Sequence, residues 1–163
     1  MATSMVTGGT SGIGREFVTQ LAARGDDIVI VARDTERMAA IKADVEARYG
    51  VSVETIAADL SRREDVDQIT TRVEDPNHPV DLLVNNAGFA VHAKILDPEA
   101  LELHDRAVEV MMRAVLVLSA AAGRAMKARG HGAILNLSSS SAWINTGNYL
   151  SLIHISEPTR LGM

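Results

Sequence analysis

A glycine-rich segment near the N-terminus has the residue types and spacing that a phosphate site needs. It reads Thr-Gly-Gly-Thr-Ser-Gly-Ile-Gly over residues 7–14, between an apolar segment and an amphipathic one. Glycine permits a positive φ in such a turn, and its missing side chain lets the backbone approach a ligand. The N-terminus of the following helix can then point amide groups at a pyrophosphate. A plain strand-to-helix turn is the alternative. We expect a dinucleotide site that includes Gly8, Thr10, Ser11, Gly12, Ile13 and Gly14.

The end of the second apolar segment indicates which dinucleotide would bind. An acid at this place usually binds the ribose 2′-hydroxyl, whereas an arginine accommodates a 2′-phosphate. Ala32 offers no carboxylate, and Arg33 offers a planar fork of donors that suits phosphate. Asp34 could be the acid, but it is equally well explained as the N-cap of the next helix. We therefore predict NADP(H) rather than NAD(H), with Arg33 at the 2′-phosphate.

A second motif, Asn-Asn-Ala-Gly at residues 85–88, follows another short apolar segment. Together with Thr-Gly-x-x-x-Gly-x-Gly at residues 7–14, it resembles the motif pair of the short-chain dehydrogenase/reductase family. The resemblance covers residues 2–149. It implies that one group of residues supports the central sheet and borders the cofactor, and that another borders the adenine ring. The first group is Asn86, Ala87 and Gly88, and the second is Asp59 and Leu60. A simple turn and a helix-capping loop are the structural alternatives.

The same resemblance implies hydride transfer between a nicotinamide and a carbonyl or alcohol carbon. In the family a serine polarises the substrate oxygen, and a tyrosine passes the proton. A lysine four residues later lowers the tyrosine pKa from its ordinary value of about 10. By match to the Asn-x-Ser-Ser pattern the serine is Ser139, and Tyr149 follows ten residues later. A polar loop residue and an aromatic plug at a helix start are the alternatives for these two.

Two positions depart from the family pattern. Met111 stands where an asparagine usually maintains a proton-relay water, and its side chain cannot hold that water by hydrogen bonding. Ile153 stands four residues after Tyr149, where the family has its lysine. We therefore expect the chain as written to be inactive, although its parent would be an enzyme.

The residues after Tyr149 differ in character from the rest of the chain. Residues 150–160 resemble the translation of a sequencing adapter. We expect residues 1–149 to be an incomplete NADP(H)-binding Rossmann domain and residues 150–163 to be a non-native tail. A complete family member would continue with the lysine-bearing helix, further strands and a substrate loop.

Short apolar segments alternate with longer amphipathic ones, a pattern typical of a parallel sheet covered by helices on both faces. We predict an α/β fold with a Rossmann-type, doubly wound parallel sheet in the order 3-2-1-4-5, truncated after the fifth strand. The expected strands are Ser4–Thr7, Asp27–Val31, Ser52–Ala57, Asp81–Val84 and Ala133–Leu137. The expected helices run from about Gly12 to Arg24, Asp34 to Tyr49, Ser61 to Val73 and Leu101 to Arg129.

Three features predict where these helices begin and end. Gly25 should end the first helix in a left-handed conformation, and Asp34 should cap the second. Ser61 with Glu64 three residues later fits a capping box for the third.

The bulk composition excludes several classes of function. A net charge of −5 and no basic cluster argue against nucleic acid as a partner. No apolar run approaches the roughly 20 residues of a membrane span, and no signal-like N-terminus is present. The chain has no cysteine, and its five histidines lack ligand spacing, so we expect no metal site. We expect a cytoplasmic protein.

The sequence leaves two functions open. The first is an NADP(H)-dependent oxidoreductase that acts on a small carbonyl or alcohol substrate as part of a homo-oligomer. The second, suggested by Met111 and Ile153, is a non-catalytic dinucleotide-binding module or sensor. A lysine four residues after the tyrosine in the parent gene would favour the enzyme.

Overall fold

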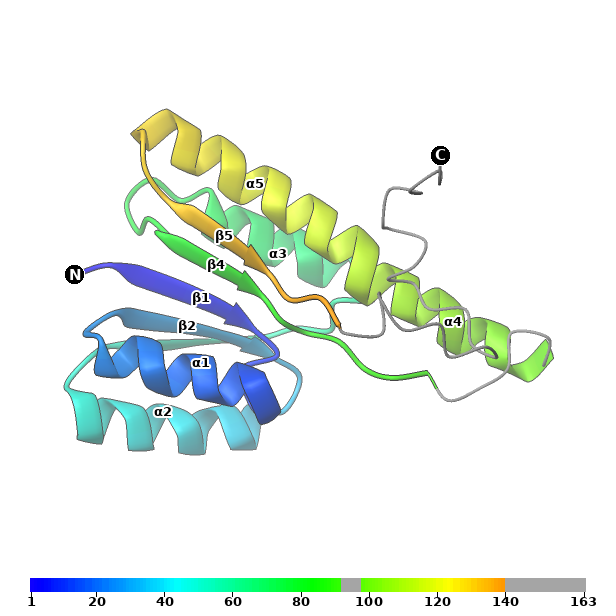
Figure 1. The fold of residues 1–163 in the computed structure, drawn as a ribbon, viewed down its shortest axis with the longest axis horizontal. Coiled ribbons are helices and arrows are strands. Elements are labelled where there is room, and N and C mark those ends of the chain that lie inside the picture. The colour runs from blue at the N-terminus through cyan, green and yellow to red at the C-terminus, as the bar shows by residue number, and fades with distance from the viewer. Residues whose placement is uncertain (92–97, 140–163) are drawn as a thin grey trace, which may run out of the picture.

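The computed structural model of the 163-residue chain describes residues 1–91 and 98–139. Its centre is a parallel sheet of five strands in the order β3-β2-β1-β4-β5, which confirms the predicted order (Figure 1). The strands are β1 (Thr3–Thr7), β2 (Asp27–Ala32), β3 (Val53–Ala57), β4 (Leu82–Asn85) and β5 (Ala133–Asn136). Each boundary lies within one residue of its predicted place, because the short apolar runs are bounded by turn-forming and charged residues.

Helices cover both faces of the sheet. Helices α1 (Gly12–Ala23) and α2 (Thr35–Tyr49) lie on one face, and α3 (Arg63–Val73) and α5 (Ala114–Arg129) lie on the other (Figure 1). The 3₁₀ turn η1 (Pro98–Ala100) leads into α4 (Leu101–Val108), and the π-helical turn η2 (Glu109–Arg113) joins α4 to α5. The single long helix predicted over residues 101–129 is thus interrupted by one wider turn. The apolar spacing of the sequence does not reveal such a turn, because a π turn differs from an α-helical turn by a single residue.

The helix ends match two of the three predictions. Gly25 adopts φ +96° after α1, and Asp34 Oδ1 accepts a hydrogen bond of 2.9 Å from the Arg37 amide at the start of α2. The predicted capping box is wrong, because α3 begins at Arg63 and Arg62 is its N-cap. The Ser61 hydroxyl instead donates to Asp59 Oδ1 at 2.7 Å, so the neighbouring carboxylate takes the hydroxyl that would have capped the helix.

Two hydrophobic clusters fill the space between the sheet and its helices. Met5, Val29 and Leu83 pack toward α3 and α5, while Val6, Ile30 and Val84 pack toward α1 and α2. Alternate residues of β1, β2 and β4 thus serve opposite faces, as the side-chain period of two requires. These strands are buried on both faces, which explains their continuous apolar sequences.

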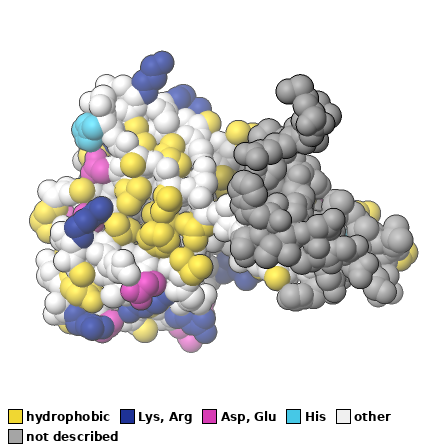
Figure 2. Space-filling model, viewed as in Figure 1, with side chains coloured by type: hydrophobic (Ala, Val, Ile, Leu, Met, Phe, Trp, Pro, Cys, Tyr) yellow, Lys and Arg dark blue, Asp and Glu magenta, His cyan; other side chains and the backbone are white. Residues whose placement is uncertain are grey.

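The strand β5 differs from the interior strands because its four residues are all exposed. Figure 2 shows hydrophobic side chains gathered on the face of the molecule where β5 lies, and Ile134 and Leu135 are among the exposed large hydrophobics. Within residues 1–91 and 98–139, no helix is long and apolar enough to cross a membrane.

Candidate functional site

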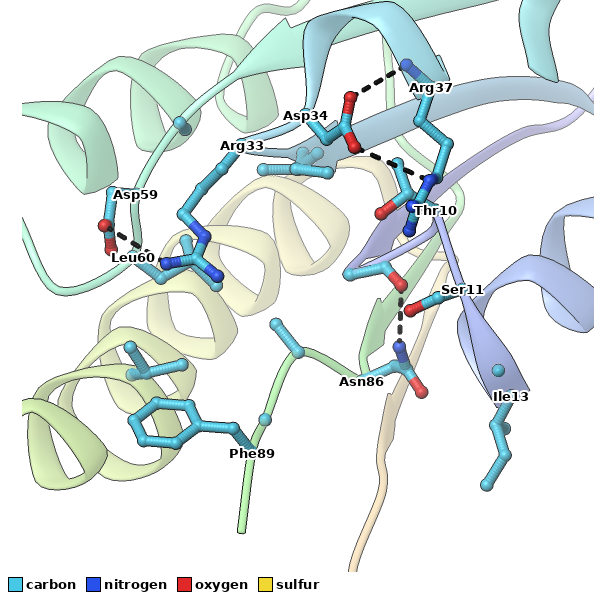
Figure 3. A pocket seen from close by; sticks show the side chains of 18 of the residues that line it. Thr10, Ser11, Ile13, Arg33, Asp34, Arg37, Asp59, Leu60, Asn86 and Phe89 are labelled. Atoms are coloured by element: carbon cyan, nitrogen blue, oxygen red, sulfur yellow. Dashed lines mark hydrogen bonds and ion pairs between the residues drawn. The ribbon is translucent and has the colours of Figure 1, made fainter. Parts of the chain in front are cut away.

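A cavity of about 730 Å³ opens where the carboxyl ends of the strands meet the helix starts (Figure 3). Its size lies within the usual range of small-molecule and cofactor sites. Eleven of the twelve residues predicted to bind the cofactor line this cavity. They are Gly8, Thr10, Ser11, Gly12, Ile13, Arg33, Asp59, Leu60, Asn86, Ala87 and Gly88. The parallel sheet gathers them because all its strands end at the same edge.

The twelfth residue, Gly14, lies behind the turn. A side chain at this position would collide with the Gly8 carbonyl and the Asn86 side-chain amide. Gly8 has φ +69° and Gly12 has φ +51°, a region that side chains other than hydrogen rarely adopt. Glycine is therefore required at residue 14 for close packing and at residues 8 and 12 for the backbone conformation.

The N-terminus of α1 faces the cavity, and the N-cap side chain does not accept a hydrogen bond from its first backbone amides. Ser11 is the N-cap, its backbone is extended, and its hydroxyl makes no capping hydrogen bond. The first turn contains no acidic residue. Beside it, a side chain built at Gly12 would meet nothing within 4 Å. The first amides of α1, with the positive end of the helix dipole, therefore open onto space that an anionic group could fill.

The Asn-Asn-Ala-Gly segment is joined to the glycine-rich turn through the buried Thr7. The Thr7 hydroxyl accepts hydrogen bonds from the backbone amides of Asn86 and Ala87, at 3.0 and 3.1 Å. The Asn86 side chain donates to the carbonyls of Thr7 and Gly8, at 2.9 and 3.3 Å. Asn85 points elsewhere, since its amide donates to Ser119 and Asn136. These bonds fix the ends of β1 and β4 together beneath the cavity.

One wall of the cavity carries two arginines, Arg33 just after β2 and Arg37 in the first turn of α2. Asp34 caps α2, and its other oxygen lies 3.5 Å from Nε of Arg37, so this acid is engaged within its own helix turn (Figure 3). Arg33 is 68% exposed, and its nearest carboxylate is Asp59 Oδ2 at 3.8 Å. Asp34 itself also lines the cavity. Arg33 is thus the more loosely held of the two cations.

Asp59 is the most heavily bonded acid of the site. Its Oδ1 accepts from the Ser61 amide and hydroxyl, at 3.0 and 2.7 Å, and its Oδ2 lies 2.6 Å from Nη2 of Arg106. Burial raises the pKa of the Asp59 carboxyl, but the Ser61 hydrogen bonds and the charges of Arg106 and Arg33 outweigh it and hold the pKa below its usual value. Asp59 therefore stays ionised at neutral pH.

Sequence reasoning missed several residues of the cavity. Arg37 lies four residues after Arg33, one helical turn away, and Phe89 directly follows Gly88, so their positions relative to predicted residues could have found them. Arg106 and Val110 come from α4 and its π turn. Arg106 is 47 residues from Asp59 in the chain, and nothing in the sequence signals that the two meet.

Of the two predicted catalytic residues, the structure describes Ser139 alone, and Ser139 is not among the described residues that line the cavity. Ser139 follows β5 and is half-buried. Tyr149 and Ile153 lie outside the described residues. Met111, in η2, packs against the hydrophobic cluster beneath α5, and its sulfur lies next to Gly88. An apolar thioether therefore lies beside Gly88, and its correspondence to the asparagine of the family pattern stays a prediction. Among residues 1–91 and 98–139, no cluster of acidic residues and histidines could hold a metal ion.

Comparison with known proteins gives consistent matches. The sequence model of the family described as short chain dehydrogenase matches residues 2–151. A short chain dehydrogenase of Pseudocercospora fijiensis is 35% identical over 138 residues, which are 84% of this chain and 44% of the relative. A very-long-chain 3-oxoacyl-CoA reductase of Laccaria bicolor is 35% identical over 140 residues, covering 85% of this chain and 41% of the relative. The chain thus spans less than half the length of these two relatives.

Solved structures give the same result. A short-chain dehydrogenase from Sphingobium yanoikuyae in complex with NADPH matches with a TM-score of 0.84 and 31% identity, covering 91% of this chain and 57% of the other. The L-sorbose reductase of Gluconobacter frateurii, complexed with NADPH and L-sorbose, matches with a TM-score of 0.80 and 32% identity, covering 86% and 53%.

Proposed function

Because the chain belongs to the short chain dehydrogenase family, we propose that its cavity binds NADP(H) for hydride transfer to or from a carbonyl or alcohol carbon. When bound, the nicotinamide supplies or accepts the hydride. The single observation that carries the preference for NADP(H) is Arg33, which lines the cavity at the end of β2 with most of its side chain exposed. Similar structures solved in complex with NADPH, such as those from Sphingobium yanoikuyae and Gluconobacter frateurii, support the same choice.

The described residues fit such a cofactor. The open amides of α1 and the turn at Gly8–Gly12 suit a pyrophosphate, because they offer hydrogen-bond donors and a positive dipole end. Asp59 and Leu60 would border the adenine ring, and Arg33 would meet the 2′-phosphate with its planar donor fork. Asn86, Ala87 and Gly88 would form the side of the cavity that continues toward the nicotinamide.

For the chemical step we propose the roles that the family pattern gives. Ser139 would donate a hydrogen bond to the substrate oxygen, and Tyr149 would exchange the proton with it. Ile153 cannot lower the pKa of a tyrosine as a lysine would, because it carries no charge. We therefore expect binding without turnover from the chain as written.

Titration of the 163-residue chain with NADPH and with NADH, followed by cofactor fluorescence, tests the binding proposal. We expect tighter binding of NADPH. Arg33→Asp should reverse the preference by about tenfold or more, on the scale of one charge-assisted contact. Arg48→Asp is the matched control, because it makes the same charge change at the far end of α2, outside the cavity. Equal affinity of the unmodified chain for both cofactors would refute the preference.

The same preparation tests turnover. NADPH oxidation is followed with a panel of ketones and aldehydes, beside a chain whose tail is replaced by a family-typical segment with lysine at position 153. Turnover only in the second protein is the expected result. Equal rates in both proteins would show that the role given to the lysine is wrong.

A further inference from the structure

We propose that Arg106 is a positioning residue that sets the preference for a 2′-phosphate by holding the Asp59 carboxylate and so keeping Arg33 available. This inference rests on the proposed function of the cavity, and it assigns a specificity role to a residue that α4 contributes to the cavity. Arg106 itself would act through Asp59 rather than by touching the reacting atoms.

The geometry shows one carboxylate between two arginines. Asp59 Oδ2 lies 2.6 Å from Arg106 Nη2 and 3.8 Å from Arg33 Nη1. The shorter distance is a charge-assisted hydrogen bond, whereas the longer one is a loose ion pair. Arg106 is therefore the principal partner of Asp59, and Arg33 is a secondary partner that can leave.

The helix that carries Arg106 is held in place by its neighbours. Ala107 is fully buried, and Val110 packs into the cluster beneath α5. The backbone of α4 and η2 is thus anchored beside the cavity, and the guanidinium is delivered to Asp59 from a fixed direction. The Arg106 side chain itself is 41% exposed, so water partly screens its pair with Asp59.

The charges of the cavity explain why this pairing would matter to a phosphate. Among the described residues that line it, there are three arginines, Arg33, Arg37 and Arg106, and two aspartates, Asp34 and Asp59. Asp34 already faces Arg37. Without Arg106, the Asp59 carboxylate would have Arg33 as its remaining cation within 4 Å in the described residues, and would compete with a phosphate for it. The carboxylate would also repel the phosphate directly.

The two cofactors separate this effect from a general loss of binding. NADPH and NADH share the adenine, both riboses and the pyrophosphate, so damage to the adenine region affects both equally. Only the 2′-phosphate senses the competition for Arg33. The ratio of the two dissociation constants therefore reports on the proposed role, and a merely structural role would leave the ratio unchanged.

The experiment compares the dissociation constants of NADPH and NADH for the 163-residue chain and four variants: Arg106→Gln, Arg106→Lys, Asp59→Asn and the double variant of Arg106→Gln with Asp59→Asn. We expect Arg106→Gln to weaken NADPH binding about threefold to tenfold more than NADH binding, as a partly exposed ion pair allows. Arg106→Lys keeps the charge and should retain most of the preference. Asp59→Asn should raise the preference for NADPH, and the double variant should restore it at least to the original ratio, because no carboxylate is left to compete.

Arg124→Gln is the matched control. Arg124 also joins a helix to a carboxylate, Glu74, at 2.6 Å, but it lies outside the cavity. Its loss should leave the cofactor ratio unchanged, and circular dichroism checks that each variant is folded.

Several results would overturn the inference. Equal weakening of both cofactors by Arg106→Gln would make Arg106 a structural residue of the adenine region. A ratio that the double variant does not restore would mean that Arg106 acts without Asp59. If Arg106→Gln does not fold, Asp59→Asn still tests the proposal. A lower preference for NADPH in Asp59→Asn than in the original chain would contradict it. Failure of the proposed function is distinguishable, since the unmodified chain would then bind neither cofactor or show no preference.

Discussion

The two edge strands of the sheet, β3 and β5, are built in opposite ways. In β3, Val53 and Ile56 are buried, while Glu54 faces outward and pairs with Arg72 of α3 at 2.9 Å. In β5, all four residues are exposed, and Ile134 and Leu135 are 37% and 40% exposed. Both strands have one sheet neighbour in the described part of the chain, so the difference lies in their side chains.

This contrast shows how an edge can be protected by charge and helix cover. Charged residues on an edge strand discourage pairing with another chain, and an exposed apolar edge invites it. Arg72 of α3 reaches the β3 edge through Glu54, and its second hydrogen bond, to the His78 carbonyl at 2.6 Å, holds the Arg72 side chain in place. The apolar sequence of β5 is instead typical of an interior strand of a parallel sheet. Such strands are buried by packed elements on both faces of the sheet. The edge at β3 is therefore protected by charge and helix cover, whereas the edge at β5 exposes apolar side chains.

The largest expected effect comes from the same substitution made at both edges. Ile56 is 6% exposed in the core between the sheet and α3. Its replacement by alanine should lower the free energy of unfolding by about 2–4 kcal/mol, because the lost contacts leave a cavity. Ile134→Ala should cost about 1 kcal/mol or less, since its side chain is partly in water already. Urea denaturation followed by circular dichroism measures both.

Equal losses at the two positions would contradict the comparison. They would mean that Ile134 is buried in the protein in solution, for example by a second copy of the chain. Repeating the two measurements at several protein concentrations separates this case, because only a shared interface makes stability depend on concentration.

A smaller effect is expected at the buried polar link beneath β1 and β2. Asp26 is buried and accepts a hydrogen bond of 2.6 Å from the Ser4 hydroxyl and two from Arg24. Burial raises the pKa of this carboxyl, but the bonds from Arg24 and Ser4 outweigh it, so its pKa is lowered in the folded protein. Asp26→Asn should therefore cost about 1–2 kcal/mol at pH 7, the scale of lost bonds to a charged group.

The sign of the shift fixes the pH dependence. A lowered pKa adds stability that is complete above the unfolded value of about 3.9 and is lost as the pH falls through the folded value. The difference between the original chain and Asp26→Asn should shrink as the pH falls below about 4. Ser4→Ala removes one donor and should show part of the same loss. A difference that stays constant from pH 7 into this acid range would rule out the ionised carboxylate as the source.

The fold was predictable because short apolar runs and amphipathic segments alternate without ambiguity. Every strand boundary was correct to within one residue. The error at the start of α3 arose because one side chain had two possible hydrogen-bond partners. Ser61 had both a helix terminus and the Asp59 carboxylate within reach, and the sequence could not show that the carboxylate is bonded. The π turn at Glu109–Arg113 adds one residue to a helical turn, a change too small for the spacing of apolar residues to single out.

The residues of the candidate site also fall into two groups, those that the sequence could predict and those that it could not. The place of residues in local motifs, such as Gly12 and Asn86, at the cavity was predictable because each motif follows the end of a strand. Arg106 was missed because its partner Asp59 lies 47 residues away, and only the packing of α4 brings them together. The spacing of residues within a motif predicts which residues lie at the end of a strand. It does not predict which charged side chains from distant parts of the chain form ion pairs at the cavity.

The smallest expected effect is on self-association through the β5 edge. The exposed side chains of Ile134 and Leu135 and the unpaired side of β5 in the described residues form a template for another strand. Leu135→Lys places a charge on this edge and should weaken self-association by about threefold, as judged by light scattering against concentration. Thr55→Lys makes the matched change on β3, where Glu54 is already present, and should have less effect. If both lysines weaken association equally, general charge repulsion explains the result. If Leu135→Lys has no effect, association does not use the edge at β5, and the contrast between the two edge strands is then one of composition alone.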